Sequence, residues 1–148
     1  MNLKERKKVA IRFYTRGKSL IETSKKIHGD YGFDILLYIG IELILKSYLV
    51  IKDQDISEDK LRKYGHNLEE LRKDASKYDD LNVISSDDFQ EIIDNLTEFY
   101  SPNITDLRYN NREPIRIFPL RTYEVLSKRL VEPMNYILIA FSPEKEWK

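Results

Sequence analysis

The sequence predicts an all-α fold: an up-and-down bundle of about five helices, in one domain that covers residues 1–148. Three observations favour this fold. The composition suits helices, with 41% hydrophobic and 34% charged residues but only 5 Gly and 5 Pro. The length of 148 residues allows one buried core. Helical periodicity recurs in five segments that are joined by mostly short links.

The first predicted helix covers residues 3–28. Two rows of residues repeat along it at seven-residue spacing and share one face. The large row is Phe13, Leu20 and Ile27, and the small row is Ala10, Gly17 and Ser24. Because small side chains let a partner helix approach closely, we expect a long amphipathic helix that packs tightly against a neighbour.

The second predicted helix, residues 33–52, is apolar almost all round, as in a buried central helix or a membrane span. Glu42 and Lys46 lie inside it. Each would cost ~2.5–3.5 kcal/mol at the centre of a bilayer, and the uncharged stretches beside them are too short to span one. We therefore expect a core helix and no membrane insertion.

Residues 53–66 are polar, and we expect them to form a link. Asn67 and Glu70 then have the spacing of a capping box, in which the residue that caps the helix is followed by an acid three positions later. A third helix is therefore predicted over residues 67–78.

Two more helices are expected toward the C-terminus. Ser86 is a good N-terminal residue for a helix over residues 86–100. Pro119 suits the first turn of a helix over residues 119–142, which we expect Pro133 to kink.

The charge is unevenly distributed although the net charge is zero. Residues 1–28 hold nine Lys and Arg against two Glu, whereas residues 53–94 hold thirteen Asp and Glu against six Lys and Arg. This separation fits an anionic partner at the first helix, two copies matched head to tail, or a basic face that is only solvated.

Disulfides and thiolate metal sites are excluded, because the chain has no cysteine, and its two histidines cannot build a typical zinc site. We expect no metal and no cofactor. The N-terminal residues include no apolar run of the kind found in secretory signals, so a cytoplasmic location is expected.

Three segments within about residues 18–142 place polar residues at set positions. They are YGFDILLYIGIELILKSYL with Glu42 and Lys46, GHNLEEL with Gly65, His66 and Leu68, and LRYNNRE with Arg108 and Tyr109. In order and spacing they resemble the central helix, the Gly/Thr-His-x-Leu helix start and the Arg-Tyr-Pro segment of HEPN domains, with Asn110 in place of the proline.

This resemblance implies a prokaryotic HEPN-like bundle that forms a homodimer. It further implies RNA or nucleotide as a ligand, a nucleotidyltransferase or another protein as a partner, and a role in toxin–antitoxin or phage-defence systems. The family's ribonucleases carry Arg, four to six residues, then His. Here only three residues separate Arg62 from His66, and the nearest arginine before His28 is Arg16. Cleavage by the usual motif is therefore not expected.

A polar cluster is predicted around the second helix, because buried charges need partners. Its members are Glu42, Lys46, His66, Arg108 and Tyr109. In one interpretation they form a phosphate-binding pocket, with Lys46 and Arg108 as anion contacts and His66 as a proton carrier. In the other, Glu42 accepts hydrogen bonds from His66 and Arg108 and fixes the bundle without any ligand.

An arginine-rich stretch follows the fourth predicted helix. It offers phosphate contacts and stacking surfaces to single-stranded RNA, or is only solvated or dimer-facing. Its residues are Arg108, Tyr109, Arg112, Arg116, Phe118 and Arg121.

Three functions are thus considered. The first is an RNA- or nucleotide-binding protein of a prokaryotic stress or defence module, without the standard ribonuclease motif. The alternative is a protein-interaction subunit. The third is an atypical, metal-independent ribonuclease that uses His66, Arg108 and Arg112.

Overall fold

The structure, a computed structural model, describes residues 1–30, 32–79, 84–100 and 118–143. Over these residues the secondary structure is helical and no strand forms, which confirms the all-α class. The elements are α1 (Leu3–Lys26), α2 (Phe33–Lys52), α3 (Glu58–Tyr64), α4 (Leu68–Ser76), α5 (Asp87–Tyr100), α7 (Arg121–Leu126), the π-helical turn η2 (Ser127–Val131) and α8 (Glu132–Phe141).

Helix α1 begins with a capping box. The Asn2 side chain accepts a hydrogen bond from the Glu5 amide at 2.8 Å, and the Glu5 carboxylate accepts one from the Asn2 amide at 3.0 Å. At the other end, Lys25 and Lys26 lie in the last turn, where positive charge complements the helix dipole. The helix ends at Lys26, two residues before the predicted end.

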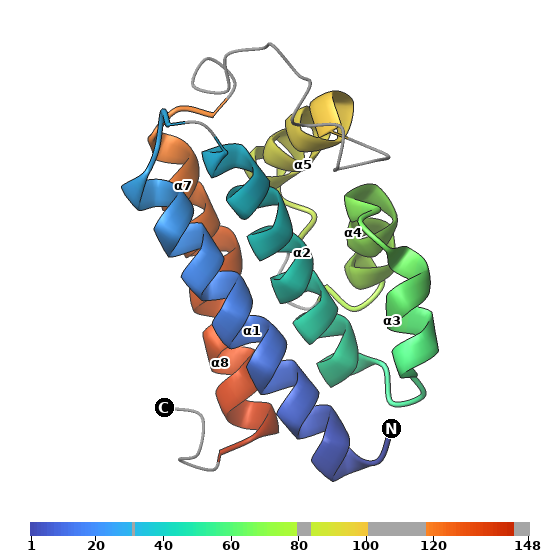
Figure 1. The fold of residues 1–148 in the computed structure, drawn as a ribbon. Coiled ribbons are helices and arrows are strands. Elements are labelled where there is room, and N and C mark those ends of the chain that lie inside the picture. The colour runs from blue at the N-terminus through green and yellow to red at the C-terminus, as the bar shows by residue number, and fades with distance from the viewer. Residues whose placement is uncertain (31, 80–83, 101–117, 144–148) are drawn as a thin grey trace.

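Helices α1 and α2 lie side by side and approach closely (Figure 1). A Cβ atom added to Gly17 would lie 2.7 Å from the Gly40 carbonyl oxygen, and one added to Gly40 would lie 2.9 Å from that of Gly17. The Ser47 hydroxyl donates to the Ala10 carbonyl at 2.7 Å. Ala10, Gly17 and Ser24 are all buried, so the predicted role of the small row is confirmed.

The large row does not lie at the centre of this interface. Phe13, Leu20 and Ile27 are only partly buried, whereas Tyr14 and Ile21 are 4% and 5% exposed. The reason is steric: where the two backbones nearly touch at the small row, larger side chains fit only at the flanks. The large row therefore flanks the close contact, with Phe13 and Ile27 packed against the core.

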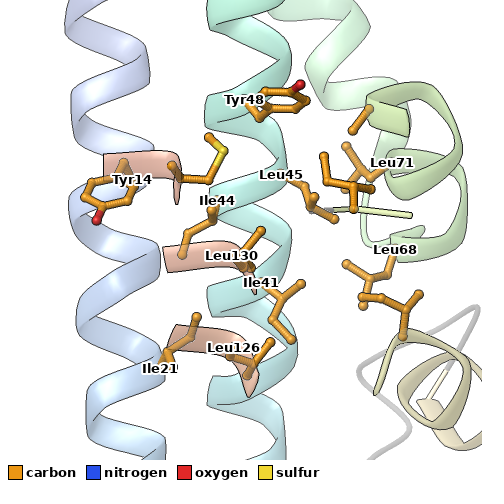
Figure 2. Close-up of a cluster of buried hydrophobic side chains, with 14 of the residues drawn as sticks. Tyr14, Ile21, Ile41, Ile44, Leu45, Tyr48, Leu68, Leu71, Leu126 and Leu130 are labelled. Carbon is orange, nitrogen blue, oxygen red and sulfur yellow. The ribbon is translucent and has the colours of Figure 1, made fainter. Parts of the chain in front are cut away.

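Helix α2 is the centre of the core. Figure 2 shows its side chains between those of α1 and the C-terminal helices on one side and those of α4 on the other. The labelled residues are Tyr14, Ile21, Ile41, Ile44, Leu45, Tyr48, Leu68, Leu71, Leu126 and Leu130. Among the described helices, none has both the length and the apolar character of a membrane span.

Arg6 has a structural role that the sequence does not reveal. It is 7% exposed, and its guanidinium donates to the carbonyl oxygens of Val50 at 3.0 Å and Ile51 at 2.8 Å. It also lies over the Phe141 ring, 5.2 Å from the centroid. Arg6 thus satisfies carbonyl oxygens at the C-terminal end of α2. Its contact with Phe141 also packs α8 against this end of α2.

The expected link over residues 53–66 contains a helix, α3, so that expectation is wrong. The Ser57 hydroxyl accepts from the Lys60 amide at 3.1 Å and caps it, and Glu58 and Asp59 occupy its first turn. A polar segment can still be helical when it buries two residues on one face, here Leu61 and Tyr64.

Helices α4 and α5 start close to their predicted positions. The Asn67 side chain accepts from the Glu70 amide at 3.1 Å, as its spacing predicts. Helix α4 stops at Ser76, two residues before the predicted end, and α5 starts at Asp87, one residue after the predicted start.

The last predicted helix is interrupted rather than simply kinked. It begins at Arg121, two residues later than expected, and residues 127–131 form the π-helical turn η2. Pro133, two residues after the end of η2, has no N–H to donate to the preceding turn, which accounts for the irregularity. The Tyr14 hydroxyl donates to the Val131 carbonyl of this turn at 3.2 Å and ties it to α1.

Candidate nucleic-acid interface

Glu42 is the centre of a polar cluster on the side of α2 that faces α3 and α4. The residue is 3% exposed, and both of its carboxylate oxygens have partners. Lys46 Nζ lies 3.2 Å from Oε2, and His66 Nδ1 lies 2.8 Å from Oε1. The Lys46 ammonium and the hydrogen bond with His66 offset the cost of burying the carboxylate.

Backbone contacts hold the two partners of Glu42 in place. Lys46 Nζ also donates to the Gly65 carbonyl at 3.1 Å, and the Tyr38 hydroxyl donates to the His66 carbonyl. Burial raises the pKa of Tyr38 to about 12, so this hydroxyl stays protonated at neutral pH. Gly65 has φ +54°, a left-handed value that favours glycine at this bend. The cluster therefore attaches the α3–α4 junction to α2.

The arrangement of Glu42 and His66 also suits proton transfer. A buried carboxylate that binds Nδ1 fixes the orientation of the imidazole ring and favours the tautomer with a proton on that atom. The His66 side chain is 49% exposed, and among the described residues no group forms a hydrogen bond with Nε2. The same hydrogen bonds equally serve a purely structural attachment.

The structure brings together three of the five residues predicted for this cluster: Glu42, Lys46 and His66. Tyr38 and the Gly65 carbonyl complete it, and neither was predicted. The remaining predicted site residues, Arg108, Tyr109 and Arg112, lie outside the described residues. Phe118 is 1% exposed, so it is not the stacking surface suggested by the sequence.

A row of cations runs along the outward face of α1. Its members, the basic row, are Lys4, Lys8, Arg12 and Arg16. All four are exposed. Their four-residue spacing places them on one side of the helix over about 18 Å. In the described part of the chain, no carboxylate pairs with any of them.

A hollow of about 230 Å³ connects the basic row to the polar cluster. Arg12, Lys46 and Arg62 contribute cations to its lining, and Glu58, which pairs with Arg62 at 3.4 Å, contributes the acid. Its apolar lining residues are Val9, Phe13 and Leu61. Cations around an apolar surface suit a stacked base between two phosphates.

The charge separation in the sequence indicated a basic first helix, but it did not show which cations are exposed and unpaired. That depends on which residues α1 buries against α2. Among the described residues, no group of three or more His, Asp or Glu is placed to hold a metal ion.

Comparisons of the chain with protein-family models, with curated proteins and with solved structures find no match. The resemblance to HEPN domains therefore stays a prediction.

Proposed function

We propose that this chain is an HEPN-like protein of a prokaryotic stress or defence module, and that it binds single-stranded RNA along the outward face of α1. The basic row carries the proposal: Lys4, Lys8, Arg12 and Arg16 form a line of exposed cations without acidic partners among the described residues. Cations arranged in this way gain little within the chain and much from contact with phosphates.

The mode of binding follows from the exposure of the row. The phosphates would lie along α1 and release bound counterions, so affinity depends strongly on salt and weakly on base sequence. The hollow beside Arg12 accepts a base at one position along the strand. Lys46 is already bound to Glu42 and Gly65, so Arg12 is the better phosphate contact.

The test is a fluorescence-anisotropy titration of a labelled RNA of about 20 nucleotides. Wild type is compared with the double variant Lys8→Gln/Arg12→Gln. The matched control is Lys63→Gln/Lys73→Gln, which removes the same charge from exposed residues of α3 and α4. Circular dichroism checks that all three proteins are folded.

We expect the α1 variant to bind RNA at least about 10-fold more weakly than wild type at low salt, and the control to bind within about 3-fold of wild type. If wild type does not bind RNA, or if both variants lose affinity equally, the basic row is not the interface. A protein partner then becomes the better hypothesis.

A second candidate, the atypical ribonuclease, is favoured by one observation, the hydrogen bond between buried Glu42 and half-exposed His66. His66 would accept or donate the proton of a ribose hydroxyl. This role predicts that wild type cleaves RNA in the presence of a chelator and that folded His66→Gln does not. Cleavage that survives in His66→Gln, or no cleavage by wild type, excludes this role.

A further inference from the structure

The hollow beside Arg12 is small and partly apolar. Its volume of about 230 Å³ is below the roughly 300–1,000 Å³ of pockets that enclose a drug-sized ligand. Residues of α1, α2 and α3 line it, so the packing of three helices sets its shape. A site of this size suits one flat ring system rather than a whole nucleotide.

Two apolar side chains of the hollow are held in place by the core. Leu61 is 5% exposed, and Phe13 is partly buried and packs against the core. The guanidinium carbon of Arg12 lies 5.6 Å from the centroid of the Phe13 ring. Because Arg12 is exposed, its guanidinium can turn toward a phosphate and uncover the ring. The ring then offers a surface on which a base can stack.

The polar edge of the hollow is an ion pair that can rearrange. Glu58 Oε2 lies 3.4 Å from Arg62 Nη2, and Arg62 Nη1 lies 3.7 Å from Asp59 Oδ1. These three side chains are between 61% and 84% exposed, so their contacts stabilise the fold very little. Glu58 is the only acid among the described residues that line the hollow. The pair therefore offers a ligand two acceptor oxygens beside a group of N–H donors.

The four RNA bases differ in the groups that they present to such a pair. Guanine has two adjacent donors, N1–H and the N2 amino group, followed by the acceptor O6. Adenine and cytosine each place one amino donor beside an acceptor ring nitrogen, and uracil places its one donor between two acceptor oxygens. A carboxylate only accepts hydrogen bonds, so it is repelled by the acceptors that adjoin the donor in these three bases. Guanine alone lets both oxygens of Glu58 accept while Arg62 donates to O6.

We propose that the hollow is a guanine site. The base stacks on Phe13, the Glu58 carboxylate accepts from N1–H and from the N2 amino group, and the Arg62 guanidinium donates to O6. This inference rests on the proposed RNA binding along α1. The basic row contacts phosphates and reads no base, so the preference for guanine is confined to the one nucleotide at the hollow.

The test compares three labelled RNAs of about 8 nucleotides by fluorescence anisotropy at low salt. All are uridine strands with one central purine nucleotide, which is guanosine, adenosine or inosine. The three purines have rings of the same size, so the ratios of the Kd values report the contacts at the polar edge. We expect the guanosine RNA to bind at least about 5-fold more tightly than the adenosine RNA. Inosine lacks the N2 amino group, and its RNA should bind at least about 2-fold more weakly than the guanosine RNA.

The matched variants are Glu58→Gln and Glu69→Gln. Glu58→Gln replaces one acceptor oxygen with an amino group that donates, so the Kd values for the adenosine and guanosine RNAs should come within about 2-fold of each other. Glu69→Gln removes the same charge from an exposed residue of α4 and should keep the wild-type ratio. A uniform gain in affinity from the lost negative charge cancels in the ratio. Circular dichroism checks that both variants are folded.

The outcomes separate this proposal from RNA binding itself. Equal affinity of wild type for the guanosine RNA and either of the other two, or a guanine preference that survives in folded Glu58→Gln, overturns the guanine site. If the RNAs still bind, and Lys8→Gln/Arg12→Gln weakens the binding of all three, RNA binding along α1 stands without a guanine site. If wild type binds none of the RNAs, both proposals are overturned.

Discussion

The two sides of helix α2 are held by different forces. On the α1 side, Gly17 and Gly40 allow the backbones to touch, and the Ser47 hydroxyl bonds a buried carbonyl. On the α3–α4 side, polar contacts add to the apolar packing of Leu68 and Leu71: Glu42 binds His66, and the Tyr38 hydroxyl donates to the His66 carbonyl. Figure 1 shows the two sides separated by α2.

The difference predicts which helices separate from α2 most easily. Close packing of backbones tolerates almost no added volume, so the α1–α2 pair is the rigid part. Polar contacts that reach the surface weaken when a proton or an anion competes for them. We therefore expect the α3–α4 pair to open first, and to respond to pH and to bound anions.

The largest expected effect is on the α1–α2 side. Gly17→Leu places a side chain where even a Cβ would lie 2.7 Å from the Gly40 oxygen. We predict a loss of about 3 kcal/mol or more in the free energy of unfolding, measured by urea denaturation. Ser19→Leu, on the exposed face of the same helix, should change it by less than about 0.5 kcal/mol. Equal effects would contradict the close packing.

Much of this rigid side could be predicted from the sequence. The spacing of Ala10, Gly17 and Ser24 indicated a close helix contact, and the apolar character of residues 33–52 indicated a central helix. Helix α3 was missed because its polar composition outweighed the Ser57 cap. The position of the large row beside the contact could not be predicted, because spacing does not show which of two adjacent rows lies at the closest point.

A smaller effect is expected at the polar cluster. Lys46→Met removes the ammonium partner of Glu42 and leaves the buried carboxylate with only its hydrogen bond to His66. Because the cluster reaches the surface, we predict a loss of about 2 kcal/mol by thermal or urea unfolding. Lys63→Met, at an exposed position, is the matched control. If the two variants are equally stable, the cluster does not attach the α3–α4 junction.

The smallest effect is expected between α3 and α4, where the Tyr64 hydroxyl donates to the Asp74 carboxylate at 2.5 Å. We predict that Tyr64→Phe costs about 1 kcal/mol at neutral pH, whereas Tyr136→Phe, at an exposed ring, costs almost nothing.

The effect of Tyr64→Phe should depend on pH. The hydrogen bond from Tyr64 lowers the pKa of Asp74 below its usual value. The contact with Lys77 lowers this pKa further. A carboxyl with a lowered folded-state pKa stabilises the fold above its unfolded pKa, and that stability is lost as the pH falls through the folded value. The difference between wild type and Tyr64→Phe should therefore shrink below about pH 4. A difference that grows in acid would contradict this assignment.

The candidate site was predictable only in part. Glu42 and Lys46 were noticeable because charges inside an apolar helix need partners, and His66 was one partner. Tyr38 and Gly65 contribute through hydrogen bonds to partners 28 and 19 residues away in the sequence, which no local pattern indicates. The basic row became clear only when the buried face of α1 was known.

The most direct test of RNA binding along α1 is the salt dependence of the affinity. Four phosphate contacts to a single strand predict that log K falls with log salt with a slope of about −2.8, and Lys8→Gln/Arg12→Gln should reduce that slope by about half. The Lys63→Gln/Lys73→Gln control should keep the wild-type slope. A slope near zero, or the same slope in wild type and the α1 variant, would contradict binding along the basic row.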